Sequence, residues 1–275
     1  MFGIKLLYAT KKFVGFTRKG LMTMFFMQVA ALLAVYLSAM VLLIYMKKDI
    51  SIANFAWGGG VLVLTLYTFF SSGTYDQREV LVTSLITLWA VRMIVHLYCR
   101  YTGKDPRFTT WRTEGGSKAL AVHIFYIFGP QLLLLLIMSV PSIIVNSGVQ
   151  PNLELLDFIG LGLWVIGFCC EALGDYQLYM FTKNPSNSHK IMRYGLWRYT
   201  RHPNYFGEVV MWWGMFLIAY SAPGGIFALI SPVTITILLL FVTGIPLVER
   251  ALENNPEFQE YKRKTSAFFP WFPGK

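Results

Sequence analysis

One polar stretch interrupts the apolar segments of this chain: Gly195-Leu-Trp-Arg198-Tyr-Thr-Arg201-His202-Pro203-Asn204-Tyr205-Phe-Gly207-Glu208. It concentrates basic, acidic, amide and aromatic side chains, while long apolar runs lie on both sides of it. Ionisable groups between apolar helices are costly and mark places where something polar is held. The stretch therefore predicts a polar ligand site where two such helices meet.

The composition around this stretch is that of an integral membrane protein. The chain has 275 residues, of which 55% are hydrophobic and 14% charged, whereas soluble domains carry about 25% charged residues. The mean hydropathy is +0.51. Runs of about 20 apolar residues fit the hydrocarbon core of a bilayer. We expect an all-α integral membrane fold with about seven transmembrane helices, at about 22–46, 51–72, 79–100, 121–145, 156–181, 205–222 and 225–247.

We expect the chain to form a single multi-pass membrane domain over residues 1–275. Residues 1–20 mix lysine and arginine with aromatic side chains, a composition typical of a helix lying in the membrane interface. The loops near 47–50, 101–120 and 182–204 are expected to share one face with the tail, residues 248–275. Because most of the basic residues fall on that face, the C-terminus is expected in the cytosol.

The same basic residues raise the question of a nucleic-acid partner. We expect none, because the positive charge frames membrane helices and no nucleic-acid-binding motif is present. The three cysteines, Cys99, Cys169 and Cys170, fall within or at the end of predicted spans. We expect them to act as small apolar residues that form no disulfide. No Cys/His cluster in the sequence has the spacing of a metal site.

Basic side chains follow one face of the third predicted span. Arg92, His96 and Arg100 are four residues apart, so they share a helix face. An arginine inside a span costs roughly 2.5–3.5 kcal/mol on insertion scales. Two interpretations remain: a buried ion pair with a carboxylate of a neighbouring helix, or a stripe that lines a polar cavity.

Two carboxylates share a face of the fifth predicted span. Glu171 and Asp175 are also four residues apart. They are expected either to pair with Arg92 or Arg198, or to accept hydrogen bonds from the hydroxyl and amide groups of a ligand.

The sixth predicted helix begins inside the polar stretch. Pro203 suits the first position of a helix, where its missing N–H has no cost. Asn204 and Glu208 then share a face. Arg198 and Arg201 precede the helix N-terminus, where backbone N–H groups favour an anion. The pattern predicts a phosphate site in which Arg198, Arg201 and Asn204 converge.

The tail holds two further candidates, Arg250 and Tyr261. They are expected to fold back over a cofactor. The alternative is that the tail is an interfacial anchor, for which its closing aromatic residues are suited.

Three segments together resemble one family. They are Gly195–Glu208 as quoted above, Trp212-Trp213-Gly214, and Tyr261-Lys-Arg-Lys-Thr-Ser-Ala-Phe-Phe-Pro-Trp271. They resemble the steroid 5-alpha-reductase C-terminal domain family, and more closely its bacterial branch. The resemblance covers about 80–275 as a reductase-like region. The shorter Arg-His-Pro-x-Tyr core is shared with membrane methyltransferases.

The resemblance implies a fold, a cofactor and a reaction. It implies a seven-helix membrane reductase, here in the bacterial inner membrane, that uses NADPH to reduce an activated carbon–carbon double bond of a steroid-like or isoprenoid lipid. The cofactor-binding residues implied by position or by the preceding reasoning are Arg100, Glu171, Asp175, Arg198, Arg201, His202, Asn204, Tyr205, Glu208, Arg250 and Tyr261. The catalytic candidates are Tyr98, Tyr205 and His96, one of which is expected to donate a hydrogen bond to the substrate oxygen.

One departure from the family concerns the substrate. The steroid reductases carry a Gln-Glu pair near the start of the second span, where this chain reads Asn54-Phe55-Ala-Trp57. The expected substrate-binding residues are Asn54, Trp57, Trp89 and Arg92. The missing carboxylate argues against a steroid enone and leaves the reduction of another lipid open.

Two other functions compete with the reductase. One is an S-adenosylmethionine-dependent methyltransferase of the isoprenylcysteine or phospholipid type, which shares Arg-His-Pro-x-Tyr. Those enzymes carry adjacent glutamates after the last span, whereas the pair here is Glu249-Arg250. The other is a lipid-binding membrane protein without catalysis, which the in-span Arg92, Glu171 and Asp175 disfavour.

Overall fold

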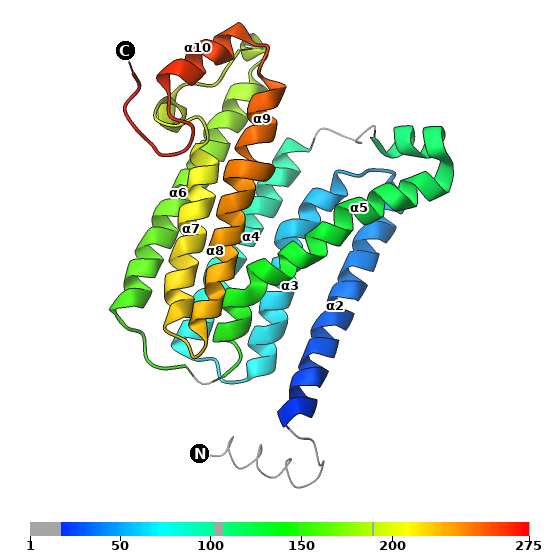
Figure 1. Ribbon diagram of the computed structural model, residues 1–275, viewed down its shortest axis with the longest axis vertical. Helices are drawn as coiled ribbons and strands as arrows, with labels where there is room; N and C mark the ends of the chain where they lie inside the picture. The colour runs from blue at the N-terminus through cyan, green and yellow to red at the C-terminus, as the bar shows by residue number, and fades with distance from the viewer. Residues whose placement is uncertain (1–17, 102–106, 149, 189, 275) are drawn as a thin grey trace.

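The computed structural model describes residues 18–101, 107–148, 150–188 and 190–274. The described chain is a bundle of α-helices without a β-strand, so the predicted all-α class is confirmed. The expected interfacial helix at 1–20 falls almost entirely outside the described residues. The helices are α2 (Arg18–Lys47), α3 (Ile52–Ser72), α4 (Gln77–Arg100), α5 (Arg107–Val145), α6 (Leu155–Lys183), α7 (Pro203–Tyr220), α8 (Ile230–Ile237), α9 (Ile245–Ala251) and α10 (Pro256–Lys264) (Figure 1).

Six segments of the described chain are long and apolar enough to cross a membrane. They are Met27–Lys47, Ile52–Ser72, Gln77–Arg100, Ala121–Val145, Leu155–Lys183 and Gly225–Ala251. The last combines the 3-10 turn η3 (Gly225–Leu229), α8, the π-helical turn η4 (Leu238–Val242) and α9. The protein is therefore an integral, multi-pass membrane protein.

The remaining predicted span corresponds to α7. This helix has 18 residues and is therefore about 27 Å long. It is less apolar than the other six because its first turns carry Asn204 and Glu208. It nevertheless runs along α6 inside the bundle (Figure 1). The first turns of α7 are therefore one source of polar groups in the interior.

Glycines let α6 and α7 approach until their backbones touch. A Cβ added at Gly167 of α6 would lie 2.5 Å from the carbonyl oxygen of Gly207 on α7, and one at Gly160 would lie 2.6 Å from that of Gly214. No real Cβ contact is that short, so only glycine fits this seam. The seam fixes the register of the two helices that carry most of the polar residues.

Replacing Gly167 with alanine is expected to lower the free energy of unfolding by about 1–3 kcal/mol, as overpacking does in well-packed interiors. Gly162→Ala is the matched control on the same helix, because nothing lies within 4 Å of its added Cβ. This control is expected to be neutral or to stabilise by about 0.5–1 kcal/mol. Thermal unfolding in one detergent compares the two, and equal stabilities would contradict the seam.

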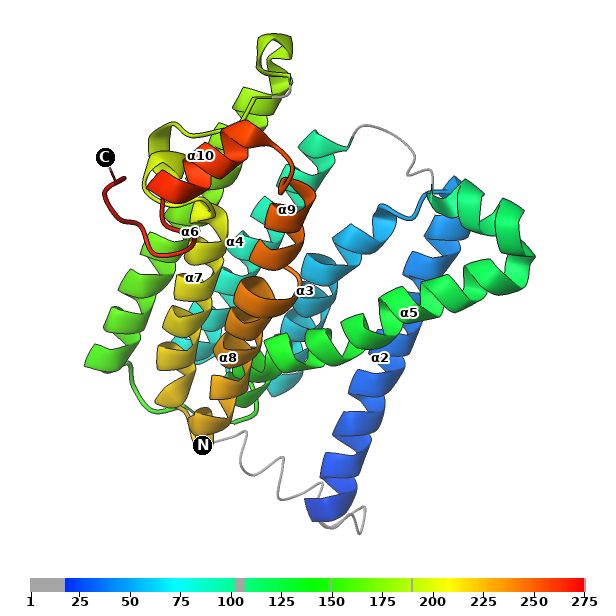
Figure 2. The same ribbon diagram turned by 45° about the horizontal axis from the view of Figure 1, so that its top comes forward.

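The described parts of the segments expected to share a face lie at one end of the bundle, although residues 107–120, expected in a loop, form the start of α5 (Figure 1). The ends of α2, α4, α6 and α9, the starts of α3 and α7, and α10 with the C-terminus gather there, while the loop between α3 and α4 lies at the opposite end (Figures 1 and 2). We call the first of these ends the tail end.

The tail folds back over the polar stretch. The backbone N–H of Arg201 donates to the carbonyl of Ser266 at 2.8 Å, and that of Trp271 donates to the carbonyl of Tyr199 at 2.9 Å. The Thr200 hydroxyl donates to the carbonyl of Phe268 at 2.9 Å. These bonds join two segments far apart in sequence and hold the start of α7 in place.

Candidate active site

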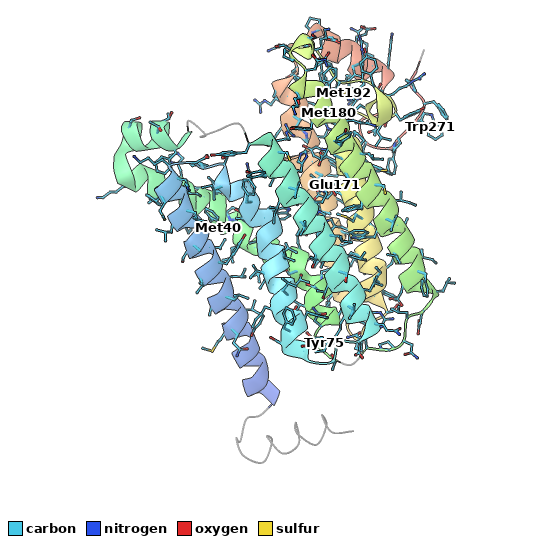
Figure 3. All side chains as sticks on the ribbon, turned by 180° about the vertical axis from the view of Figure 1, so that it is seen from behind. Met40, Tyr75, Glu171, Met180, Met192 and Trp271 are labelled. Atoms are coloured by element: carbon cyan, nitrogen blue, oxygen red, sulfur yellow. The ribbon has the colours of Figure 1, made fainter. Side chains whose placement is uncertain are left out.

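A cavity of about 630 Å³ lies within the half of the bundle nearer the tail end. Its volume is in the range of small-molecule and cofactor sites. Figure 3 shows Glu171, one of its lining residues, between the end that carries Met192 and Trp271 and the opposite end near Tyr75. The polar lining residues come from five helices: Asn54 and Trp57 (α3), Arg92 and His96 (α4), Gln131 (α5), Glu171 and Asp175 (α6), and Asn204, Tyr205 and Glu208 (α7).

Arg92 connects α4 to α6 through both predicted carboxylates. Its Nη1 lies 2.6 Å from Oδ2 of Asp175, and its Nη2 donates to Oε1 of Glu171. Nε2 of His96 lies 3.7 Å from the same Oδ2 of Asp175. Arg92 therefore combines the two interpretations given above: it forms buried ion pairs with Glu171 and Asp175, and the paired side chains line a cavity.

The first turns of α7 complete the polar wall. Pro203 occupies the first position of the helix, as predicted. Nδ2 of Asn204 donates to Oδ1 of Asp175 at 3.1 Å, and Glu208 follows one turn later on the same wall. Asp175 therefore stands between a guanidinium and an amide, with both of its oxygens engaged.

Three buried polar atoms of this wall have no hydrogen-bond partner among the described residues. They are Nε of Arg92, Oε2 of Glu171 and Oδ1 of Asn204. Buried polar groups are normally hydrogen-bonded, so these three atoms are candidates for contact with a ligand or an ordered water. One donor and two acceptors here fit a ligand that carries amide or hydroxyl groups.

Several predicted residues do not reach the cavity. Tyr98 is 75% exposed on the outer side of α4, which removes it as a donor to a bound substrate. Trp89 is buried against Trp212, with ring centroids 5.3 Å apart, and belongs to the apolar core. Arg100 and Arg250 are exposed and do not line the cavity. Of these residues only Arg100 was expected from a shared helix face, that of Arg92 and His96.

The structure does not bring Arg198, Arg201 and Asn204 into one phosphate site. Nε and Nη2 of Arg201 donate to Oε1 of Glu249 at 2.8 and 2.7 Å. Its Nη1 donates to the backbone carbonyls of Lys262 and Thr265. Arg201 is only 7% exposed, and four of its five N–H donors are used in holding the tail, so its guanidinium is committed to the tail and not to a phosphate at the cavity.

Arg198 and Tyr261 lie in a different hollow. This hollow, of about 170 Å³, is formed between the polar stretch and the tail and is also lined by Arg193 and Lys264. The Tyr261 hydroxyl donates to the carbonyl of Trp197. The tail therefore folds back as predicted, but Tyr261 fastens it to the polar stretch and does not line the main cavity.

His202 joins the tail to the cavity wall. Its Nε2–H donates to Oε1 of Glu249 at 3.2 Å, and its ring stacks on that of Tyr205, with centroids 5.2 Å apart and planes within 2°. Burial lowers the pKa of His202 below its ordinary value, and the bond to Glu249 opposes this only in part.

Sequence reasoning missed two residues of this arrangement. Glu249, the inward-facing member of Glu249-Arg250, carries the tail contacts, whereas Arg250 was the predicted one. Gln131 lines the cavity and donates from Nε2 to the carbonyl of Ala53 at 3.1 Å. The signal for Gln131 was available, because it follows Pro130 as the one amide in an apolar run.

The sequence matches the family described as "Protein of unknown function (DUF1295)" over residues 40–265. The chain belongs to the DUF1295 family. The matched region includes Arg92, His96, Glu171, Asp175 and Asn204, which are in contact across α4, α6 and α7. It ends at Thr265 and so includes part of the tail.

This DUF1295 protein is also similar to named enzymes. It is 31% identical over 117 residues to "3-oxo-5-alpha-steroid 4-dehydrogenase 1" of Homo sapiens, and 31% identical over 112 residues to the protein of that name in Mus musculus. The human alignment covers 41% of this chain and 40% of the human enzyme's length. A Schizosaccharomyces pombe protein, "Uncharacterized protein C594.04c", is 25% identical over 225 residues, 72% of this chain and 65% of that protein. Membership of the steroid 5-alpha-reductase-like superfamily, expected from the three sequence segments, is thereby confirmed.

Proposed function

We propose that this protein is a membrane reductase that transfers a hydride from NADPH to an activated carbon–carbon double bond of a lipid. The observation that carries the proposal is the contact of Asn204 with Asp175, which is itself paired with Arg92, at the wall of a cavity inside a membrane bundle. Relatives named steroid 4-dehydrogenases support the reaction class.

The residues present fit the non-phosphate part of the cofactor. The unpaired Oε2 of Glu171 and Oδ1 of Asn204 accept hydrogen bonds, as a carboxamide NH₂ and ribose hydroxyls require. Bound NADPH would supply the hydride at the cavity. The three carboxylates Glu171, Asp175 and Glu208 repel phosphates, so we place the phosphates toward the tail end, where Arg100 is exposed one turn beyond His96.

Two of the three proposed hydrogen-bond donors remain. Tyr205 and His96 both line the cavity. A donor aimed at the substrate oxygen stabilises the negative charge that develops there as the double bond is reduced. Either side chain supplies such a donor, and Asn54 and Trp57 of α3 lie on the same cavity, where we place the substrate.

The apolar part of the lining sets the substrate class. Met93, Leu97, Ile127 and Leu134 share the cavity with the polar wall. A ligand that satisfies both parts has a hydrocarbon body and one polarised end, as a steroid-like or isoprenoid lipid with an activated double bond does. Because positively charged ends of membrane bundles face the cytosol, we propose that the tail end is cytosolic, in a bacterial inner membrane.

NADPH is expected to stabilise the detergent-purified protein. At a hundredfold excess over the dissociation constant, the gain is about 2.7 kcal/mol of unfolding free energy. Asn204→Ala removes an amide that holds Asp175 and offers Oδ1 to the ligand, so most of the gain should disappear. Thr65→Val is the control, because it removes a buried hydrogen bond to Ser142 on residues that do not line the cavity.

The same thermal-shift measurement separates the competing functions. S-adenosylmethionine in place of NADPH should give no gain. A gain with S-adenosylmethionine alone would favour the methyltransferase, and no gain with either in a well-folded sample would leave only lipid binding.

A further inference from the structure

An unbroken series of side-chain contacts leads from the tail to the cavity. Lys262, on α10, lies 3.0 Å from Oε2 of Glu249, and the other oxygen of Glu249 accepts from His202. The His202 ring stacks on Tyr205, which lines the cavity. His202 itself is 4% exposed and does not line the cavity.

We infer that His202 is a positioning residue: its imidazole, fixed by Glu249, sets the orientation of the Tyr205 ring at the cavity wall and so makes the site depend on a docked tail. Its effect on cofactor affinity rests on the proposed function, whereas its effect on the Tyr205 ring does not.

The Tyr205 ring packs against the apolar core and against the imidazole of His202. Within the described part of the chain, the Tyr205 hydroxyl makes no hydrogen bond, so ring contacts decide where the phenol points. His202 precedes α7 by one position and Tyr205 is three residues further on, which is the spacing at which side chains meet on a helix. Their planes are parallel within 2°, so the imidazole supports one face of the phenol ring.

The imidazole is in turn fixed from several sides. Glu249 is bound by Arg201 at 2.7 Å and by Lys262 at 3.0 Å, so the oxygen that accepts from His202 has little freedom. The backbone N–H of His202 donates to the Thr200 hydroxyl, which bonds the carbonyls of Ala267 and Phe268 in the tail. Both the side chain and the backbone of His202 are thereby tied to the tail.

The first test observes the Tyr205 ring directly. Protein labelled with 3-fluorotyrosine is studied by ¹⁹F NMR, and the Tyr205 resonance is identified by its loss in Tyr205→Phe. His202→Ala should shift and broaden that resonance, while His202→Phe, which keeps a flat ring, should leave it narrow. Thr65→Val should leave it unchanged. An unaltered Tyr205 resonance in His202→Ala overturns the inference.

A milder variant keeps this test decisive if His202→Ala does not fold. Glu249→Gln preserves the shape of the side chain and weakens the bond to His202. It should move the Tyr205 resonance in the same direction by a smaller amount. No movement in a folded Glu249→Gln sample likewise overturns the inference.

The second test is a double-mutant cycle on NADPH affinity. An aromatic contact is worth about 0.5–1.5 kcal/mol, so Tyr205→Ala and His202→Ala should each raise the dissociation constant by up to about tenfold. The double variant should be no weaker than Tyr205→Ala alone, because His202 acts through Tyr205, and His202→Phe should recover most of the affinity. Additive losses overturn the inference. If wild-type protein binds no NADPH, the proposed function fails, and the ¹⁹F result still decides the positioning role.

Discussion

Arg92→Leu should lower the free energy of unfolding by about 3–5 kcal/mol, as does the removal of one partner from a buried ion pair, and should abolish NADPH binding. Arg92 is the shared partner of Glu171 and Asp175, whose side chains are 6% and 11% exposed. Without it, two carboxylates face each other and Glu208 in a low-dielectric cavity. Thermal unfolding and equilibrium NADPH binding measure the two effects.

The control for this variant lies on the same helix. Arg100→Leu is the control for stability only, because Arg100 lies where we place the phosphates; it removes an exposed cation two turns away, and surface substitutions of that kind change stability by about 0.5 kcal/mol or less. Adding Glu171→Gln and Asp175→Asn to Arg92→Leu should restore part of the lost stability, because the two carboxylates that lost their partner are then neutral amides. A loss below about 1 kcal/mol in Arg92→Leu would show that the ion pairs do not stabilise the bundle.

Glu249→Leu should also cost about 3–5 kcal/mol, because it leaves the buried guanidinium of Arg201 without its carboxylate. It should release the tail as well, since Lys262 and His202 lose the same partner. Limited trypsin digestion should then cut at Lys262, Arg263 or Lys264 faster than in the wild type. Thermal unfolding of the same sample gives the loss of stability.

Two variants test the cause of that loss. Glu253→Leu removes an exposed carboxylate one turn beyond Glu249 and should leave both the digestion pattern and the unfolding temperature unchanged. Arg201→Leu combined with Glu249→Leu should be more stable than Glu249→Leu alone, because the unpaired buried charge is gone. If the double variant is the less stable one, the charge pair is not the cause.

Hydropathy and helical spacing account for what the sequence predicted well. The spans follow from runs of apolar residues, and their order fixes which loops share an end of the bundle. The four-residue spacings of Arg92 with His96, and of Glu171 with Asp175, placed these groups on faces that do meet. In each case the physical cause lies within a single helix.

The misplaced residues depend on contacts between distant segments. Arg201 is paired with Glu249, 48 residues later, and no local pattern distinguishes that arginine from a free phosphate ligand. Trp89 on α4 packs against Trp212 on α7, a contact between residues far apart in the sequence. Spacing along a helix gives the common face of several residues, but only tertiary packing gives the direction of that face.

The backbone contact between α6 and α7 has a mechanical consequence. Gly167 and Gly207 leave no layer of side chains between these helices, so the two cannot slide or separate as the others can. Asp175 on α6 and Asn204 on α7 therefore move together as parts of one rigid pair of helices. Room for the proposed lipid substrate must come from the facing wall, where α5 is tilted across the bundle and carries Pro130 beside the cavity (Figure 2).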